Sequence, residues 1–176
     1  MTATMQSARS SAAGSATPID FTQISFLVVD DQPFARRLIR SMLHSFGSRE
    51  VYESTNGTEA LELFHTTVPD VIITDLVMPD LDGVRFIKTA KAPDAPTRTI
   101  PIIVLSGYLT KTTALEVRRA GAAELLVKPV SPKALHEHVS RVVPHIESAG
   151  ARAALMRSQR RTAFLGKKQT AEVALI

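Results

Sequence analysis

The sequence contains no cysteine and no tryptophan among its 176 residues. The absence of cysteine excludes disulfide bonds, thiolate zinc sites and cysteine nucleophiles, and it fits a reducing compartment. Long apolar runs are missing too, since none approaches the ~20 residues of a membrane-spanning helix. The first twenty residues contain no continuous apolar stretch of the kind found in a secretory signal. We therefore expect a cytoplasmic protein without a membrane segment.

Charge of one sign is in excess only near the C-terminus. The formal net charge is +4, and residues 21–144 carry 14 Lys and Arg against 14 Asp and Glu. Residues 145–176 carry six Lys and Arg against two Glu. A basic segment can bind nucleic acid or acidic surfaces, but cations spread this thinly are more typical of a solvated segment. We expect a flexible basic tail over 145–176 and a disordered tail over the Ser- and Ala-rich residues 1–20.

Between the two tails, short apolar runs alternate with segments of helical period. Runs that are apolar on both faces are typical of strands in a buried parallel sheet, and we expect strands at 24–29, 71–73 and 100–105, with shorter ones near 51–52 and 125–127. Helices are expected over 33–46, 58–65, 84–90, 112–120 and 131–143. Five repeats of this alternation predict an α/β fold with a doubly wound parallel sheet and helices on both faces.

The helical segments carry recognisable stripes and caps. The apolar residues of the first helix recur every four positions, at Phe34, Leu38, Met42 and Phe46. The helix over 112–120 carries Leu115 and is expected to end at Gly121 as a left-handed cap. The last helix begins with Ser131 as an N-cap, followed by proline at the first helical position.

Chemically active side chains stand where the predicted strands end. These positions hold Asp30 and Asp31, Asp75, Ser106 and Gly107, and Lys128 and Pro129. In an open parallel sheet the carboxyl ends of the strands line one crevice. We therefore expect three carboxylates, a hydroxyl and an ammonium to converge there.

This combination of groups restricts the chemistry of the site. Clustered carboxylates repel one another unless a cation neutralises them, and hard oxygen ligands with open positions suit Mg²⁺. A lysine and a serine beside the metal would bind the equatorial oxygens of a phosphoryl group. A carboxylate acting as the nucleophile would form an aspartyl-phosphate.

Four stretches, FLVVDD, DLVMPDLDG, IIVLSG and AGAAELLVKP, resemble the receiver domains of two-component response regulators of the chemotaxis-regulator type. The resemblance covers about residues 22–144. It implies a (βα)5 flavodoxin-like three-layer sandwich with strand order 2-1-3-4-5, and domain bounds of 21–144. It also implies a bound Mg²⁺ and a phosphoryl group received from a sensor histidine kinase or a histidine phosphotransfer protein.

The resemblance also assigns roles to individual residues. It makes Asp75 the phospho-acceptor and, with Asp30, Asp31 and the backbone carbonyl of Val77, a ligand of Mg²⁺. Ser106 matches the switch hydroxyl and Lys128 the lysine that pairs with the phosphate, with Gly107 in the same phosphate-binding set. The peptide bond between Lys128 and Pro129 is expected to be cis.

Two features depart from the family pattern. The aromatic switch position, three residues before the lysine, is Leu125 here, which places the usual aromatic coupling in doubt. Val77 and Tyr108 flank the site where the family often has polar residues. Because apolar groups there would hinder the hydrolytic water, we predict slow self-dephosphorylation.

Several acidic residues also have simpler interpretations. Asp30 and Asp31 could by themselves cap the helix that begins at Pro33, although Asp75 and Lys128 at matching strand ends argue against capping alone. Asp80 and Asp82 are more typical of a turn leading into the next helix. Asp70 lies at the entry of a strand, on the opposite edge of the sheet.

The remaining polar residues offer little independent chemistry. His136 and His138 are two apart on a predicted helix and face different ways, which argues against metal chelation. Ser106 has no neighbouring base in a recognisable nucleophile pattern.

We therefore expect a single-domain response regulator that is not an enzyme beyond Mg²⁺-dependent self-phosphorylation and self-dephosphorylation. With no DNA-binding domain, it would act through an unknown protein target, with a phosphorylation-dependent homodimer as a further expectation. The alternative is a phosphate-independent scaffold that uses the receiver fold and the basic tail. A small hydrolase with an aspartate nucleophile is disfavoured, because the second aspartate expected two residues after Asp75 is Val77.

Overall fold

The computed structural model describes residues 19–79 and 81–145. The two predicted tails therefore lie outside the described residues, apart from Ile19, Asp20 and His145, and so does Asp80 of the predicted turn. No helix within the described ranges is long and apolar enough to cross a membrane.

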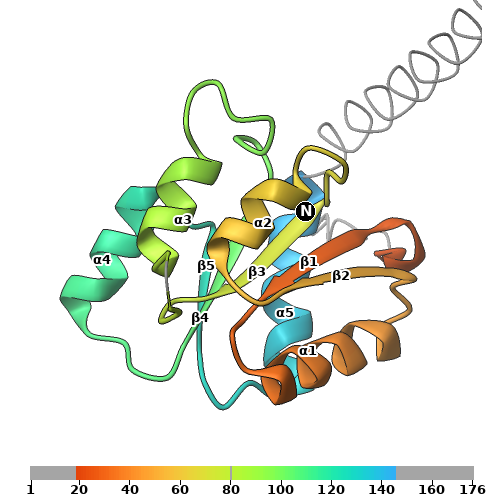
Figure 1. Cartoon of the computed structure of the whole chain (residues 1–176). Helices are drawn as coiled ribbons and strands as arrows, with labels where there is room; N and C mark the ends of the chain where they lie inside the picture. The colour runs from red at the N-terminus through yellow and green to blue at the C-terminus, as the bar shows by residue number, and fades with distance from the viewer. Residues whose placement is uncertain (1–18, 80, 146–176) are drawn as a thin grey trace, which may run out of the picture.

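A five-stranded parallel sheet forms the centre of the molecule (Figure 1). Its strands are β1 (Ser25–Val29), β2 (Glu50–Ser54), β3 (Val71–Asp75), β4 (Ile102–Ser106) and β5 (Glu124–Val127). They lie in the order β2-β1-β3-β4-β5, as the family resemblance implies. Every residue of β1, β3 and β4 is buried. This explains their continuous apolar runs, because both faces of a central parallel strand are covered.

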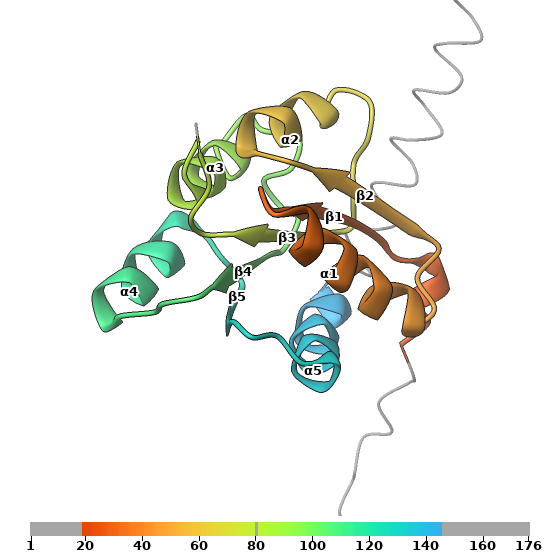
Figure 2. The same cartoon turned by 60° about the horizontal axis from the view of Figure 1, so that its bottom comes forward.

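Helices cover both faces of the sheet (Figure 2). Two of them, α1 (Pro33–Ser45) and α5 (Pro132–Val142), pack on one core cluster through Ile39, Leu43 and Leu135, among others. The other three are α2 (Gly57–Leu63), α3 (Gly83–Ala90) and α4 (Lys111–Ala120), and they pack on a second cluster. Neighbouring residues of β1 alternate between the two clusters, as the pleat of a strand requires. The doubly wound fold is confirmed.

The predicted apolar stripe of the first helix is only partly correct. The side chain of Phe34 is 72% exposed and that of Leu38 is 41% exposed. The buried residues of α1 are Ile39, Met42 and Leu43. A spacing of four residues advances by slightly more than one turn of an α-helix, so such a stripe drifts around the helix and leaves the core. In α4 likewise, Leu115 is 49% exposed, whereas Val117 and Ala120 are buried.

The predicted caps are confirmed, and one strand is longer than expected. The Ser131 side chain accepts a hydrogen bond from the Ala134 amide over 3.1 Å. Gly121 ends α4 with φ of 108°, in the left-handed region that glycine adopts without strain. Strand β2 covers Glu50–Ser54, more than the two residues expected, because an edge strand needs no continuous apolar run.

Candidate functional site

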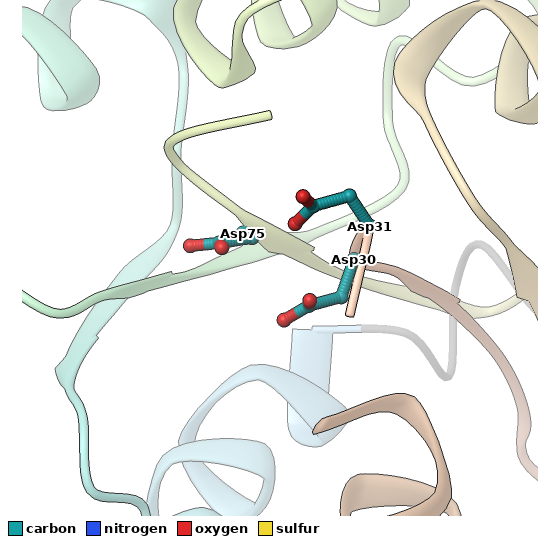
Figure 3. Close-up of side chains that lie close together, drawn as sticks. All are labelled: Asp30, Asp31 and Asp75. Carbon is teal, nitrogen blue, oxygen red and sulfur yellow. The ribbon is translucent and has the colours of Figure 1, made fainter. Parts of the chain in front are cut away.

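Three carboxylates meet at the carboxyl ends of β1 and β3 (Figure 3). One oxygen from each of Asp30, Asp31 and Asp75 lies within 4.8 Å of the others. The register of the sheet pairs Val29 with Thr74, so the residues that follow end at the same edge. Asp30 is 1% exposed and Asp75 is 5% exposed. The sequence-based prediction of a convergent acidic cluster is therefore correct in its geometry.

Lys128 joins two of these carboxylates. Its Nζ donates to Oδ2 of Asp30 over 2.8 Å and lies 2.9 Å from Oδ2 of Asp75. Burial by itself lowers the pKa of Lys128, but the hydrogen bonds and the charges of Asp30 and Asp75 outweigh it, and the pKa is raised. The backbone amide of Lys128 bonds the carbonyl of Ser106 over 2.8 Å, which ties the lysine to β4. The Lys128–Pro129 peptide bond is cis, as expected.

Backbone packing beneath Asp75 determines where its carboxylate lies. The Leu76 amide donates to Oδ1 of Asp75 over 2.7 Å. Gly83 packs directly under this turn, and its amide donates to the carbonyl of Leu76 over 2.9 Å. A Cβ on Gly83 would lie 2.7 Å from the carbonyl oxygen of Asp75, closer than real Cβ atoms approach. Asp82 caps α3 by accepting from the Arg85 amide, so its carboxylate serves the turn as predicted.

Asp30 and Asp31, the acidic pair, do not act as a simple helix cap. The N-cap of α1 is Gln32, which makes no side-chain capping bond, and Oδ1 of Asp30 instead accepts from the Gln32 amide over 2.8 Å. Oδ1 of Asp31 is buried and has no hydrogen-bond partner within the described part of the chain. A buried anionic oxygen without a donor needs compensation. A hard divalent cation such as Mg²⁺ would supply it, so the cluster fits this metal.

Ser106 is buried at the end of β4 and bonds its own loop. Its Oγ donates to the carbonyl of Tyr108 over 2.7 Å. A Cβ placed on Gly107 would meet no atom within 4 Å. This glycine therefore borders open space in the described part of the chain, and its phosphate-binding role stays a prediction.

The three residues that depart from the family pattern lie in different surroundings. Val77 is 75% exposed and Tyr108 is 80% exposed, whereas Leu125 is partly buried and packs against the core beneath α4. Leu125 thus fills space on β5 without a polar group. The metal-binding role of the Val77 carbonyl stays a prediction.

Other polar residues singled out in the sequence lie elsewhere. Asp70 accepts hydrogen bonds from the amide and hydroxyl of Ser25, at the start of β1 and the far end of the sheet from the acidic cluster. His138 pairs with Glu124, and the ring of His136 packs on Phe21 and Phe46. Among the described residues, the acidic cluster is the one group with metal-ligand geometry.

Sequence reasoning missed one contact of the site. Arg36 on α1 donates from Nη1 to the backbone carbonyl of Asp30 over 2.7 Å. Its position six residues after Asp30 places it on the first turns of the following helix, but many arginines occupy such positions. Only the packing of α1 beside β1 shows the contact.

Comparison with known proteins agrees with this geometry. The family model described as "Response regulator receiver domain" matches residues 26–140. The chain is 32% identical to the chemotaxis protein CheY of Thermotoga maritima over 116 residues, which are 66% of this chain and 94% of that protein. It is 34% identical to the regulatory protein AtoC of Escherichia coli over 117 residues, 66% of this chain but only 24% of that protein.

Solved structures show the same fold. The structure of Vibrio cholerae chemotaxis protein CheY4 superposes with a TM-score of 0.64 at 31% identity, covering 68% of this chain and 98% of the other. A response regulator receiver protein from Pseudomonas putida gives a TM-score of 0.62 at 30% identity, covering 67% and 96%. The family model spans more than half of the chain. With its acidic cluster at the carboxyl edge of a five-stranded parallel sheet, the chain belongs to the receiver domains of two-component response regulators.

Proposed function

We propose that the protein is a single-domain response regulator that accepts a phosphoryl group on Asp75. One observation carries the proposal: the Asp75 carboxylate lies 2.9 Å from the Lys128 ammonium and forms a cluster with Asp30 and Asp31. An anionic nucleophile beside a fixed cation is what phosphoryl transfer requires, because catalysis of this reaction is mostly positioning and charge stabilisation. The proposed receiver covers residues 21–144, with the tails outside it.

The proposed transfer exchanges one bond to phosphorus for another. A carboxylate oxygen of Asp75 attacks the phosphorus of a phosphohistidine on a sensor kinase or phosphotransfer protein. The new P–O bond forms as the P–N bond breaks, and the histidine nitrogen keeps the electron pair. Lys128, already bonded to Asp75, would hold one of the equatorial oxygens.

Asp30, Asp31, Asp75 and the Val77 carbonyl would hold Mg²⁺. When bound, Mg²⁺ would neutralise the charge that develops on the transferred group. The protein's own contribution is to keep the three carboxylates within 4.8 Å of one another. The buried oxygen of Asp31 is the position most in need of a cation.

The signal would leave the site through Ser106. To bond a phosphoryl oxygen, its hydroxyl must release the Tyr108 carbonyl, so the loop after β4 would rearrange. The surface formed by residues 114–120, β5 and residues 134–143 would then bind a protein target or a second copy of the chain. A ligand shifts such an equilibrium only by its differential affinity for the two conformations.

Leu125 supports a second candidate function. A partly buried leucine on β5 cannot supply the hydroxyl of an aromatic switch. If the site took up no phosphoryl group, the fold and the basic tail would serve as a phosphate-independent scaffold.

Incubation with Mg²⁺ and acetyl phosphate, followed by intact-mass spectrometry, separates the two candidates. Wild type should gain the mass of one phosphoryl group, and Asp75→Asn should gain none. Asp82→Asn is the matched control, because asparagine keeps the helix cap and the residue belongs to the turn. Absence of an adduct from acetyl phosphate and from a panel of phosphorylated kinases would favour the scaffold.

A further inference from the structure

Arg36 contacts the backbone of Asp30 and not the carboxylates of Asp30 and Asp31 (the acidic pair). Its Nη1 donates to the Asp30 carbonyl over 2.7 Å. Its Nε lies 3.4 Å from Oε2 of Glu53 on β2. The Arg36 side chain is only 12% exposed, so water competes little for these contacts. The guanidinium therefore holds the residues after β1 between α1 and β2.

Asp30 is held at four points. Its amide donates to the Ser54 carbonyl over 3.2 Å, and its carbonyl accepts from Arg36. Its two carboxylate oxygens accept from the Gln32 amide and from Lys128. Of these contacts, the Arg36 bond acts on the peptide group that joins Asp30 to Asp31.

The orientation of that peptide group matters for the next residue. A peptide bond is planar, so a fixed carbonyl direction also fixes the direction in which the Asp31 backbone leaves. Asp31 carries the buried carboxylate oxygen that has no donor within the described residues. The position of this oxygen is therefore coupled to Arg36 through one peptide plane.

We propose that Arg36 is a positioning residue for the divalent-cation site, acting through the Asp30–Asp31 peptide group. The inference rests on the proposed function, since it requires the acidic cluster to bind a divalent cation. Groups that orient metal ligands in this way typically change metal affinity by about 10–100-fold when they are removed.

If Arg36 is removed, its charge and its orienting role predict opposite changes in metal affinity. A guanidinium near the site repels a divalent cation, so loss of its charge alone would strengthen metal binding. Loss of orientation would weaken it, because Asp31 would no longer be held in the cluster. The direction of the change in affinity therefore distinguishes positioning from electrostatics.

Arg40 provides a matched control. It lies on the same helix, carries the same charge and bonds the same Glu53 over 2.6 Å. Within the described residues, the Arg40 guanidinium bonds Glu53 and makes no hydrogen bond or ion pair with Asp30. Replacing Arg40 by methionine thus removes a cation and a Glu53 contact without touching the acidic pair.

The test is titration with Mn²⁺, with free Mn²⁺ measured by electron paramagnetic resonance in wild type, Arg36→Met, Arg36→Lys and Arg40→Met. Arg36→Met should weaken binding by about tenfold. Arg36→Lys, which keeps a charge and a donor, should recover part of the loss, and Arg40→Met should stay within about twofold of wild type. Unchanged or tighter binding by Arg36→Met would overturn the inference.

A second measurement uses the metal-free protein. In ¹H–¹⁵N spectra, Arg36→Met should shift the Asp31 and Gln32 amides, and Arg40→Met should leave them in place. If Arg36→Met does not fold, Arg36→Lys keeps the charge but not the guanidinium geometry, so it should weaken Mn²⁺ binding, and unchanged binding would count against the inference. If wild type does not bind Mn²⁺, both the metal-binding part of the proposed function and this inference are wrong. If wild type binds Mn²⁺ and Arg36→Met binds it equally well, only the inference about Arg36 is wrong.

Discussion

The hydroxyl of Ser106 donates a hydrogen bond to the backbone carbonyl of Tyr108 over 2.7 Å, and accepts one from the Tyr108 amide at 3.3 Å. This pair of bonds ties the end of β4 to its own loop. A hydroxyl has a single hydrogen to donate, so Ser106 can bond either the Tyr108 carbonyl or a phosphoryl oxygen. Phosphorylation of Asp75 should therefore change the loop conformation.

Replacing Ser106 by alanine should separate phosphorylation from the loop response. Ser106→Ala should still take up a phosphoryl group from acetyl phosphate, because Asp75, Lys128 and the acidic pair are untouched. The amides of residues 107–110 should no longer shift in ¹H–¹⁵N spectra when beryllium fluoride is added as a phosphoryl mimic. Ser106→Thr keeps the hydroxyl and should keep the shifts. Equal loop shifts in Ser106→Ala would show that the loop responds by another route.

Two glycines near the site should respond differently to alanine. A Cβ at Gly83 would lie 2.7–2.8 Å from backbone atoms of Asp75 and Leu76, and backbone cannot move aside cheaply. Gly83→Ala should lower the free energy of unfolding by about 1–3 kcal/mol and reduce phosphorylation of Asp75. Gly107→Ala faces open space and should change stability by less than about 0.5 kcal/mol. Urea denaturation measures both, and equal losses would contradict the packing difference.

Removal of the Lys128 charge should destabilise the metal-free protein. Lys128→Met leaves the carboxylates of Asp30 and Asp75 without their shared donor, which should cost about 1–3 kcal/mol in urea denaturation with EDTA. Because the pKa of Lys128 is raised on folding, its contribution is present below the unfolded pKa and is lost only as pH rises through the folded value. The difference from wild type should therefore persist at neutral pH.

Added Mg²⁺ should reduce the loss of stability in Lys128→Met. Mg²⁺ is expected to stabilise Lys128→Met more than wild type, because it replaces the missing counter-charge. Lys133→Met is the control: that side chain is 86% exposed, and its partner Glu137 is 4.0 Å away. If Lys133→Met lowers the free energy of unfolding as much as Lys128→Met does, the contacts of Lys128 with Asp30 and Asp75 have no specific role in stability.

Lys91 should give the protein a pH-dependent stability in alkaline solution. Burial lowers the pKa of Lys91 to about 8, and its Nζ donates to the carbonyls of Arg98 and Ile100. Between this pKa and that of the unfolded chain, the unfolded state binds more protons, so stability rises with pH. The urea midpoint of wild type should rise relative to Lys91→Met from about pH 8 to about pH 10. Parallel curves for the two proteins would show that Lys91 titrates normally.

The apolar residues at the mouth of the site should slow loss of the phosphoryl group. Val77 and Tyr108 follow the ends of β3 and β4 by two residues and have exposed side chains, and we expect them to hinder an attacking water. Val77→Asn and Tyr108→Asn should each shorten the phosphorylated lifetime several-fold, because a polar side chain can hydrogen-bond the water. Radiolabel release from the phosphorylated protein measures the lifetime. A wild-type half-life of seconds would contradict the prediction of slow self-dephosphorylation.

Most of the fold follows from local patterns. Runs that are apolar on both faces identified β1, β3 and β4, since only buried parallel strands require them. The length of the edge strand β2 was underestimated. One side of this strand has no neighbouring strand, and its sequence combines polar and apolar residues, so it lacks a continuous apolar run. The helix caps at Gly121 and Ser131 were readable because capping depends on neighbours within a few residues.

The sequence by itself determined the acidic cluster. Asp75 is the last residue of β3, and Asp30, Asp31 and Lys128 follow the ends of β1 and β5. Parallel strands end at one edge, so the convergence of these residues needs only the topology. Tertiary structure alone decided which face of α1 is buried, leaving Phe34 and Leu38 in solvent. It also decided the contact of Arg36 with Asp30, the closeness of Gly83 to Asp75 and the open space at Gly107. These features depend on side-chain rotamers and on the packing of segments distant in sequence, which local periodicity does not encode.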